Sequence, residues 1–240
     1  TAGAIDGSTW SGIGTIDLGF DNAGNAISYG AGQTYDLTSD QTGLTLEMAA
    51  TGSAQTVAIN AGDDNGTSTA VGTITVGALD LNAGEDAIAG TVTLDATTAN
   101  FTATSVDGGA LMSMVITGDE DVTLGNTTFG AASSIDASAS TGKISLTTTT
   151  LAPTVTTGSG VDTITANGAD VHTISTGAGG DTMNITSTAD GSTFDTGAGA
   201  DTINVDDVDT YSVVGGAGDN TFNTAAALKA SIFGGDGSDT

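Results

Sequence analysis

The chain has 240 residues, of which 29 are acidic, two are lysines and one is a histidine, giving a net charge of −27. So few cations argue against binding nucleic acid or an anionic membrane surface, and the absence of cysteine excludes disulfides and thiolate metal sites. Any bound metal is therefore expected to be a hard cation held by oxygen. Abundant threonine, valine and isoleucine favour β-structure over disorder, and no apolar run approaches the ~18 residues of a membrane-inserted segment.

Residues 1–150 predict an irregular β region rich in threonine and glycine. Strands with alternating apolar residues begin at Val57, Ile74, Val92 and Val115, at uneven intervals. We interpret these strands as irregular coils of a β-solenoid. The pattern that predicts this fold is clearer in residues 151–240. Alternation with frequent glycine turns would equally suggest a separate β-sandwich.

An acidic turn lies within this region at Asp119, Glu120 and Asp121, directly after Gly118. Three acids around a glycine turn supply hard oxygens, so Asp119 and Asp121 are weaker candidates for a metal site. A solvated acidic turn explains the same residues.

Residues 151–240 contain the frame G-x-G-x-[DN]-T five times, at a nearly constant interval. An apolar residue follows two places after the acid or amide wherever the chain continues. The repeated positions are Gly158, Gly160 and Asp162; Gly177, Gly179 and Asp181; Gly197, Gly199 and Asp201; Gly216, Gly218 and Asn220; and Gly235, Gly237 and Asp239.

A second column runs between these frames at the same pitch, and each member has an apolar residue four places on. The column is Asp170, Asp190, Asp209 and Lys229, followed by Ile174, Phe194, Val213 and Phe233. Each repeat unit thus predicts two short strands and two turns. Because such strands can pair only with neighbouring units, the predicted fold is all-β, a parallel β-solenoid. The expected inward stack on the other wall is Ile164, Met183, Ile203 and Phe222.

Stacked aspartates carry an electrostatic cost. Neighbouring coils lie ~4.8 Å apart, and Coulomb's law gives about 1 kcal/mol per adjacent pair in water and about 3.5 kcal/mol at an effective dielectric of 20. A divalent cation between coils turns this repulsion into attraction, and flanking glycines with positive φ let turn carbonyls approach the ion. Calcium suits such a site best because it accepts six to eight oxygens in flexible geometry.

These turns resemble the glycine- and aspartate-rich nonapeptides of repeats-in-toxin (RTX) proteins, whose parallel β-roll binds calcium between successive turns. The resemblance covers residues 158–240. It implies that Asp162, Asp181, Asp201, Asn220 and Asp239 supply side-chain oxygens, and the paired glycines main-chain carbonyls, to several Ca²⁺ ions. The intervening half-turns lack G-x-G, so Asp170, Asp190 and Asp209 are weaker metal candidates. The roll is expected to continue beyond residue 240.

Residues 115–124 and 135–142, followed by threonine-rich strands, are similar to the calcium-dependent surface-layer (S-layer) proteins of Gram-negative bacteria. That similarity implies a secreted, extracellular structural protein that self-associates into a lattice on binding calcium. Cell-surface polysaccharide or lipopolysaccharide is a further candidate partner. The alternatives are the RTX repeat region of a type I secreted adhesin, an ice-binding β-solenoid, and a non-catalytic module of a polysaccharide-modifying enzyme.

No set of residues suggests a catalytic site, so the chain is predicted not to be an enzyme. His172 follows Asp170 in a threonine-rich strand and is expected to face solvent. Lys229 takes the place after Asp209 in the second column, where its ammonium either replaces an ion or is simply solvated. The threonine ladder that an ice-binding face needs is expected to be interrupted by asparagines at 184, 204 and 223.

Overall fold

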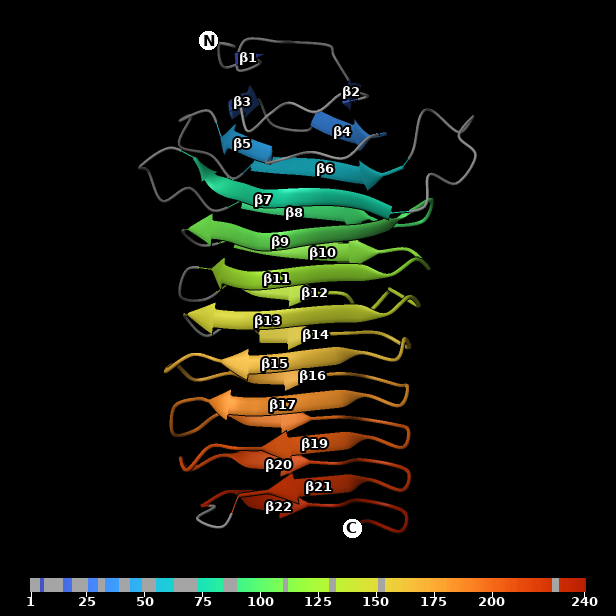
Figure 1. The fold of residues 1–240 in the computed structure, drawn as a ribbon, viewed down its shortest axis with the longest axis vertical. Helices are drawn as coiled ribbons and strands as arrows, with labels where there is room; N and C mark the ends of the chain where they lie inside the picture. Colours follow the sequence, from blue (N-terminus) through green and yellow to red (C-terminus); the bar gives the residue numbers. More distant parts are fainter. Residues whose placement is uncertain are drawn as a thin grey trace.

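The computed structural model describes residues 5–6, 15–18, 26–29, 33–38, 44–48, 55–62, 73–83, 90–109, 112–129, 133–150, 154–225 and 229–240. Within these ranges every regular element is a β-strand. The strands form two sheets of 11 strands, and successive strands along the chain alternate between them. Strand pairing is parallel throughout. The predicted parallel β-solenoid is therefore confirmed, with one strand from each sheet in every coil (Figure 1).

Sheet A holds the odd-numbered strands. They are β1 (Ile5–Asp6), β3 (Ala26–Tyr29), β5 (Leu44–Met48), β7 (Thr73–Ala83), β9 (Asn100–Gly109), β11 (Val122–Phe129), β13 (Ile144–Thr150), β15 (Thr163–Asn167), β17 (Thr182–Ser187), β19 (Thr202–Val205) and β21 (Thr221–Thr224).

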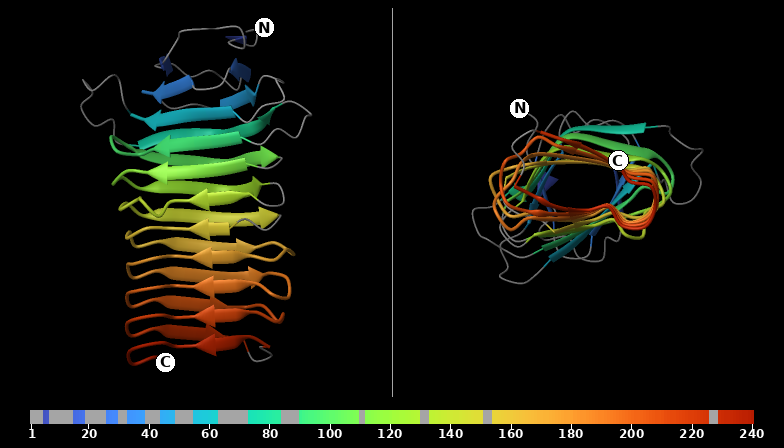
Figure 2. Two further views of the ribbon diagram at one scale, coloured as in Figure 1. Left: turned by 180° about the vertical axis from the view of Figure 1, so that it is seen from behind. Right: turned by 90° about the horizontal axis from the view of Figure 1, so that it is seen from below.

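Sheet B holds the even-numbered strands. They are β2 (Thr15–Leu18), β4 (Gln33–Leu37), β6 (Gln55–Ala61), β8 (Gly90–Asp95), β10 (Met112–Thr117), β12 (Ser134–Asp136), β14 (Thr154–Thr156), β16 (Thr173–Ser175), β18 (Thr193–Asp195), β20 (Ser212–Val214) and β22 (Ser231–Phe233). Viewed along the axis, the two sheets are the long walls of a flattened tube (Figure 2).

The C-terminal coils follow the predicted repeat closely. Ile164, Met183, Ile203 and Phe222 lie opposite one another in successive sheet A strands. The first three are fully buried. Their neighbours on the same strand point outward, because side chains alternate along a strand. The core is therefore one side chain deep from each wall, as a chain with few aromatics requires.

The described strands before residue 150 belong to the same two sheets, so the structure shows solenoid coils there and not a β-sandwich. Val57 lies opposite Val92 in sheet B, while Ile74 between them lies in sheet A. The step from Val57 to Ile74 and the step from Ile74 to Val92 therefore each lead from one sheet to the other. One full coil here runs from Val57 to Val92, so it contains more residues than a C-terminal coil. Pairings β12 with β14 and β13 with β15 cross residue 150, and the division into two regions there stays a prediction.

Buried aromatic side chains fill part of the interior along the length of the solenoid. The largest fully buried residues include Tyr35, Phe101, Phe129 and Phe194. The rings of Phe194 and Tyr211 meet edge to face, with centroids 5.8 Å apart and planes at 89°. Across the described residues, no helix is long and apolar enough to cross a membrane.

Two predictions for the sheet B side of the C-terminal coils are wrong. Ile232, and not Phe233, lies opposite Val213, and Phe233 is 58% exposed. This shift of one residue moves the exposed Lys229 out of line with Asp209, so Lys229 does not fill the same position as the aspartates of the second column.

The prediction for His172 is also wrong, because its side chain is 0% exposed. Its backbone N–H donates to the Ser192 hydroxyl (3.0 Å), while neither ring nitrogen has a hydrogen-bond partner. Desolvation by burial lowers the pKa of His172 below its usual range.

Candidate metal centre

The aspartates of the repeated frame face the interior of the solenoid. Asp162, Asp181, Asp201 and Asn220 are each 1% exposed or less, and Asp239 is half-buried. The first four each stand one residue before an outward threonine and two before an inward apolar residue, so strand alternation turns them inward. The sequence placed these residues correctly on one column but did not reveal that the column is interior.

The same interior column is apolar in the earlier coils. Phe101, Val122 and Ile144 lie opposite one another in β9, β11 and β13 and are fully buried. The backbone N–H of Ile144 then donates to Asp162 Oδ1 in the next coil, at 2.7 Å. The column therefore changes from apolar to acidic at Asp162.

Each side chain of the acidic column accepts a hydrogen bond from the main chain one coil earlier. The donors and acceptors are Asp162 N to Asp181 Oδ1 (2.8 Å), Asp181 N to Asp201 Oδ1 (2.8 Å), Asp201 N to Asn220 Oδ1 (3.1 Å), and Asn220 N to Asp239 Oδ1 (3.0 Å). One oxygen of each residue is thus used to hold adjacent coils together.

The second carboxylate oxygen is not used in this way. Asp162 Oδ2 accepts from the hydroxyl of Thr157, but Oδ2 of Asp181 and Oδ2 of Asp201 are buried and have no hydrogen-bond partner. The hydroxyls of Thr176 and Thr196 donate to main-chain carbonyls, at 3.1 and 2.9 Å, and they also lie close enough to the carboxylates of Asp181 and Asp201 to lower the pKa of each. Two buried carboxylates one coil apart therefore each present a free oxygen.

Burial makes these carboxylates hard to ionise. Desolvation raises the pKa of Asp181 to about 6, and the charges of the Asp162 and Asp201 carboxylates add to the rise. Desolvation also raises the pKa of Asp162 and Asp201 above the usual range, although the Thr157 hydroxyl and the charge of Lys143 oppose the rise at Asp162. At neutral pH the column needs either protons or cations.

Three threonines that face the aspartates inside the coil were not predicted from the sequence. Thr157, Thr176 and Thr196 are at most 2% exposed, and the hydroxyls of Thr176 and Thr196 donate to the main chain of the following coil. A signal was available, because each immediately precedes the first glycine of a frame, and Gly215 and Gly234 take that place in the last two copies. At Gly234 a Cβ would meet Asp239 Oδ2 at 2.1 Å, so glycine leaves room for the acid.

The glycine pairs are required by the stacking of the turns themselves. Both glycines of each of the last four frames have positive φ, for example +142° at Gly179, whereas Gly158 and Gly160 lack this conformation. A Cβ at Gly199 would lie 1.4 Å from the carbonyl oxygen of Gly179 in the preceding coil. The turns stack on the right in Figure 1.

The carbonyls of the first glycines already accept hydrogen bonds from the following turn. Ala178 N donates to Gly158 O, Ala198 N to Gly177 O, and Ala217 N to Gly197 O, at 2.7 to 2.8 Å. These carbonyls were expected to face calcium from the family resemblance. In this structure they join successive turns, and their contact with calcium stays a prediction.

The chemistry of the interior column nevertheless fits calcium. All of its donors are oxygens, the type that calcium prefers, and six to eight are needed at 2.3 to 2.6 Å. The coil of Asp181 and the coil of Asp201 each offer one carboxylate oxygen without a hydrogen-bond partner and one threonine hydroxyl beside it. An ion there would draw on two successive coils and on water.

The weaker candidates lie elsewhere on the coil. Asp190, on the edge away from the glycine turns, accepts from Thr210 N through Oδ1 (2.7 Å), and Asp170 and Asp209 share that edge. Asp121 is exposed and directly precedes β11 of sheet A. Its Oδ1 accepts a hydrogen bond from the backbone N–H of Lys143 (3.0 Å), and Asp119 is also exposed. Among the described residues, no three acidic or histidine side chains gather closely enough to hold a metal by themselves.

No known protein family, curated protein or solved structure matches this chain. Any functional conclusion therefore depends on the fold and on the acidic interior column.

Proposed function

We propose that this chain is a calcium-stabilised structural segment of a secreted bacterial cell-surface protein, an S-layer subunit that folds and self-associates when it binds extracellular calcium. The observation that carries the proposal is the pair of buried, unpartnered carboxylate oxygens at Asp181 and Asp201, one coil apart. A buried charge without a partner is strongly destabilising, so the fold favours any bound species that neutralises it.

Calcium is favoured over a proton outside the cell. Extracellular calcium modules typically bind at roughly 10⁻⁴ to 10⁻³ M, whereas protonating Asp181 at neutral pH works against a carboxyl pKa of about 6. In the cytosol, where calcium is scarce, the same column stays charged and opposes folding. The charge of the column thus couples folding to export.

A structural role agrees with the shape of the molecule. The stacked coils form a long, regular body, and the chain has almost no cationic groups to bind phosphates or acidic substrates. Regular solenoids present repeated, evenly spaced surfaces, which suit assembly in two dimensions.

Assembly is tested by sedimentation and negative-stain electron microscopy of the chain in metal-free buffer, with 1 mM Ca²⁺ and with 1 mM Mg²⁺. We expect ordered sheets or large assemblies with calcium alone. A chain that binds calcium but stays monomeric supports the adhesin alternative, and a chain unaffected by calcium refutes both.

A further inference from the structure

An outward strip of sheet A carries no charge, although the chain as a whole has a net charge of −27. Two adjacent columns of outward side chains run from β9 to β21, all of them hydroxyl or amide residues and none buried. The first column is Thr102, Thr123, Ser145, Thr163, Thr182, Thr202 and Thr221; the second is Ser105, Asn126, Thr147, Thr165, Asn184, Asn204 and Asn223. We name these fourteen residues the neutral strip.

The described surfaces around the neutral strip carry charged side chains, most of them acidic, with exposed Asp121 and Lys143 two residues before Thr123 and Ser145. In sheet B, one outward column, from Ser113 to Ser231, is also uncharged, but the column next to it includes exposed Asp136 and Asp195 and the exposed side chain of Phe233. The glycine edge carries exposed Asp219 and Asp236. Two copies of this chain can therefore approach without opposing like charges most readily at the neutral strip.

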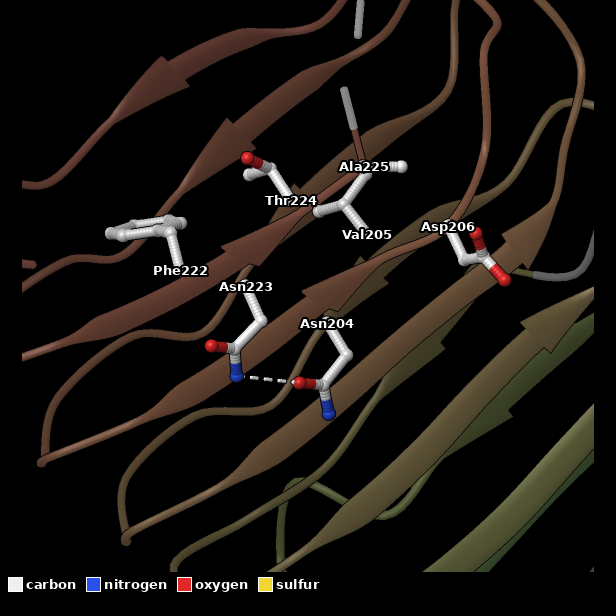
Figure 3. A pocket seen from close by; sticks show the side chains of 7 residues that line it. All are labelled: Asn204, Val205, Asp206, Phe222, Asn223, Thr224 and Ala225. Atoms are coloured by element: carbon white, nitrogen blue, oxygen red, sulfur yellow. Dashed lines mark hydrogen bonds between the residues drawn. The ribbon is translucent and has the colours of Figure 1, made fainter. Parts of the chain in front are cut away.

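A ladder of side-chain hydrogen bonds holds the C-terminal four residues of the second column in place. Asn223 Nδ2 donates to Asn204 Oδ1 (2.8 Å; Figure 3), and Asn204 Nδ2 donates to Asn184 Oδ1 (2.8 Å). Asn184 Nδ2 in turn reaches the Thr165 hydroxyl at 3.3 Å. Little side-chain entropy remains to be lost when a partner packs on such a row, which lowers the cost of association.

We propose that the neutral strip is a self-association surface whose partner is the neutral strip of a second copy. The inference rests on the proposed function, because it names the contact through which the lattice forms. Any stacked β-structure has a pitch of ~4.8 Å, so two identical strips place donors and acceptors opposite one another at the same interval along their whole length. Depletion of charge at the centre is also typical of protein interfaces.

The size of the strip indicates a weak contact. Six coil steps of about 4.8 Å and two columns about 7 Å apart give roughly 29 Å by 14 Å, or about 400 Å² on each partner. A stable pair usually buries about 800 Å² on each side. The strip therefore supports assembly in which each molecule makes several contacts, and not a tight isolated dimer.

The test uses paired charge substitutions at Thr182, in the fifth of the seven rows of the strip, with calcium present. We expect Thr182→Glu and Thr182→Lys each to lower the association constant about tenfold or more in sedimentation, since like charges then meet across the contact. An equimolar mixture of the two variants is expected to recover assembly. Thr193→Glu, on the outer face of sheet B, is the matched control and should assemble like the unmodified chain.

Circular dichroism first establishes that all variants fold. Normal assembly of Thr182→Glu, or failure of the mixture to recover, overturns the strip contact while leaving calcium-dependent assembly intact. An unmodified chain that does not assemble with calcium refutes the proposed function and the contact together. A last outcome is that the unmodified chain shows thermal hysteresis and that Thr182→Glu abolishes it without changing assembly. This result would identify the strip as an ice-binding surface and would also overturn the contact.

Discussion

The backbone N–H of Asp162 donates to Oδ1 of Asp181 at 2.8 Å, and this bond joins two successive coils inside the solenoid. The aspartate is thus a structural link between coils as well as a charge. The same carboxylate leaves Oδ2 buried and unpartnered, so the link carries a cost that a cation or a proton removes. The stability of the coils therefore depends on what neutralises this column.

Gly179 and Gly180 are neighbours in one turn with opposite tolerance of a side chain. Gly179 has φ +142°, and a Cβ there would lie 2.0 Å from the carbonyl oxygen of Gly160. At Gly180 the nearest atom is 3.4 Å away, and alanine already stands at the equivalent position 200. We expect Gly179→Ala to destabilise the fold by about 3 kcal/mol or more, and Gly180→Ala to change stability by less than about 1 kcal/mol, by thermal unfolding. Equal effects would contradict the stacked-turn geometry.

Replacing Asp181 with asparagine is expected to remove the buried charge and keep the acceptor oxygen, as Asn220 does naturally two coils later. Without calcium at pH 7.5, Asp181→Asn should raise the free energy of unfolding by about 1–2 kcal/mol, since burial raises the pKa of this carboxyl to about 6. The stabilisation by added calcium should shrink. Asp190→Asn, at an exposed position on the other edge, is the control and should change neither quantity.

The metal-free chain is expected to become more stable as the pH falls. The folded-state pKa of Asp181 is about 6 and its ordinary value is 3.8, so its stabilising protonation is complete below about 3.8 and is lost as the pH rises through about 6. His172 acts in the opposite direction, because burial lowers its pKa and acid then opposes folding.

The pH measurement therefore uses the His172→Leu variant. Its melting temperature in metal-free buffer should be higher at pH 5 than at pH 7.5. With saturating calcium the order should reverse, since protons compete with the ion. The same pH dependence with and without calcium would show that the ion does not contact these carboxylates.

Asn204 makes two side-chain hydrogen bonds within the ladder, to Asn184 and from Asn223, each at 2.8 Å. Asn204→Ala removes both, so we expect a loss of about 1–2 kcal/mol in the free energy of unfolding by urea denaturation. Asn167→Ala, at an exposed position at the end of β15, is the comparison and should cost less than about 0.5 kcal/mol. Equal losses would mean that the ladder adds nothing to stability.

The regular coils were predictable because period and alternation determine strand position. The nearly constant interval between the glycine frames correctly brought Ile164, Met183 and Ile203 into register. The alternation D-T-I also implied that Asp162 shares the inward side with Ile164, but a carboxylate in the interior runs against the usual cost of burying charge. Interior aspartates therefore became clear only from the structure.

Local spacing failed where one residue was gained or lost. Lys229 and Phe233 were aligned by counting from the preceding aspartates, yet the register of β20 with β22 places Ile232 opposite Val213. His172 stands two residues before the inward Ile174, so the alternation H-T-I implied burial there as D-T-I did at Asp162, but a polar side chain in a threonine-rich strand was assigned to the solvent side. A slip of one residue exchanges the two faces of a strand, so such errors reverse burial completely.

Calcium-dependent stability tests the central claim most directly. The unmodified chain is unfolded thermally at pH 7.5 in metal-free buffer, with 1 mM Ca²⁺, and with 1 mM Mg²⁺, while the β signal is followed by circular dichroism. If calcium occupies the column, its melting temperature rises with calcium, corresponding to about 2.7 kcal/mol at a hundredfold excess over the dissociation constant, and magnesium has little effect. An unchanged melting temperature and strand signal in calcium would contradict the account.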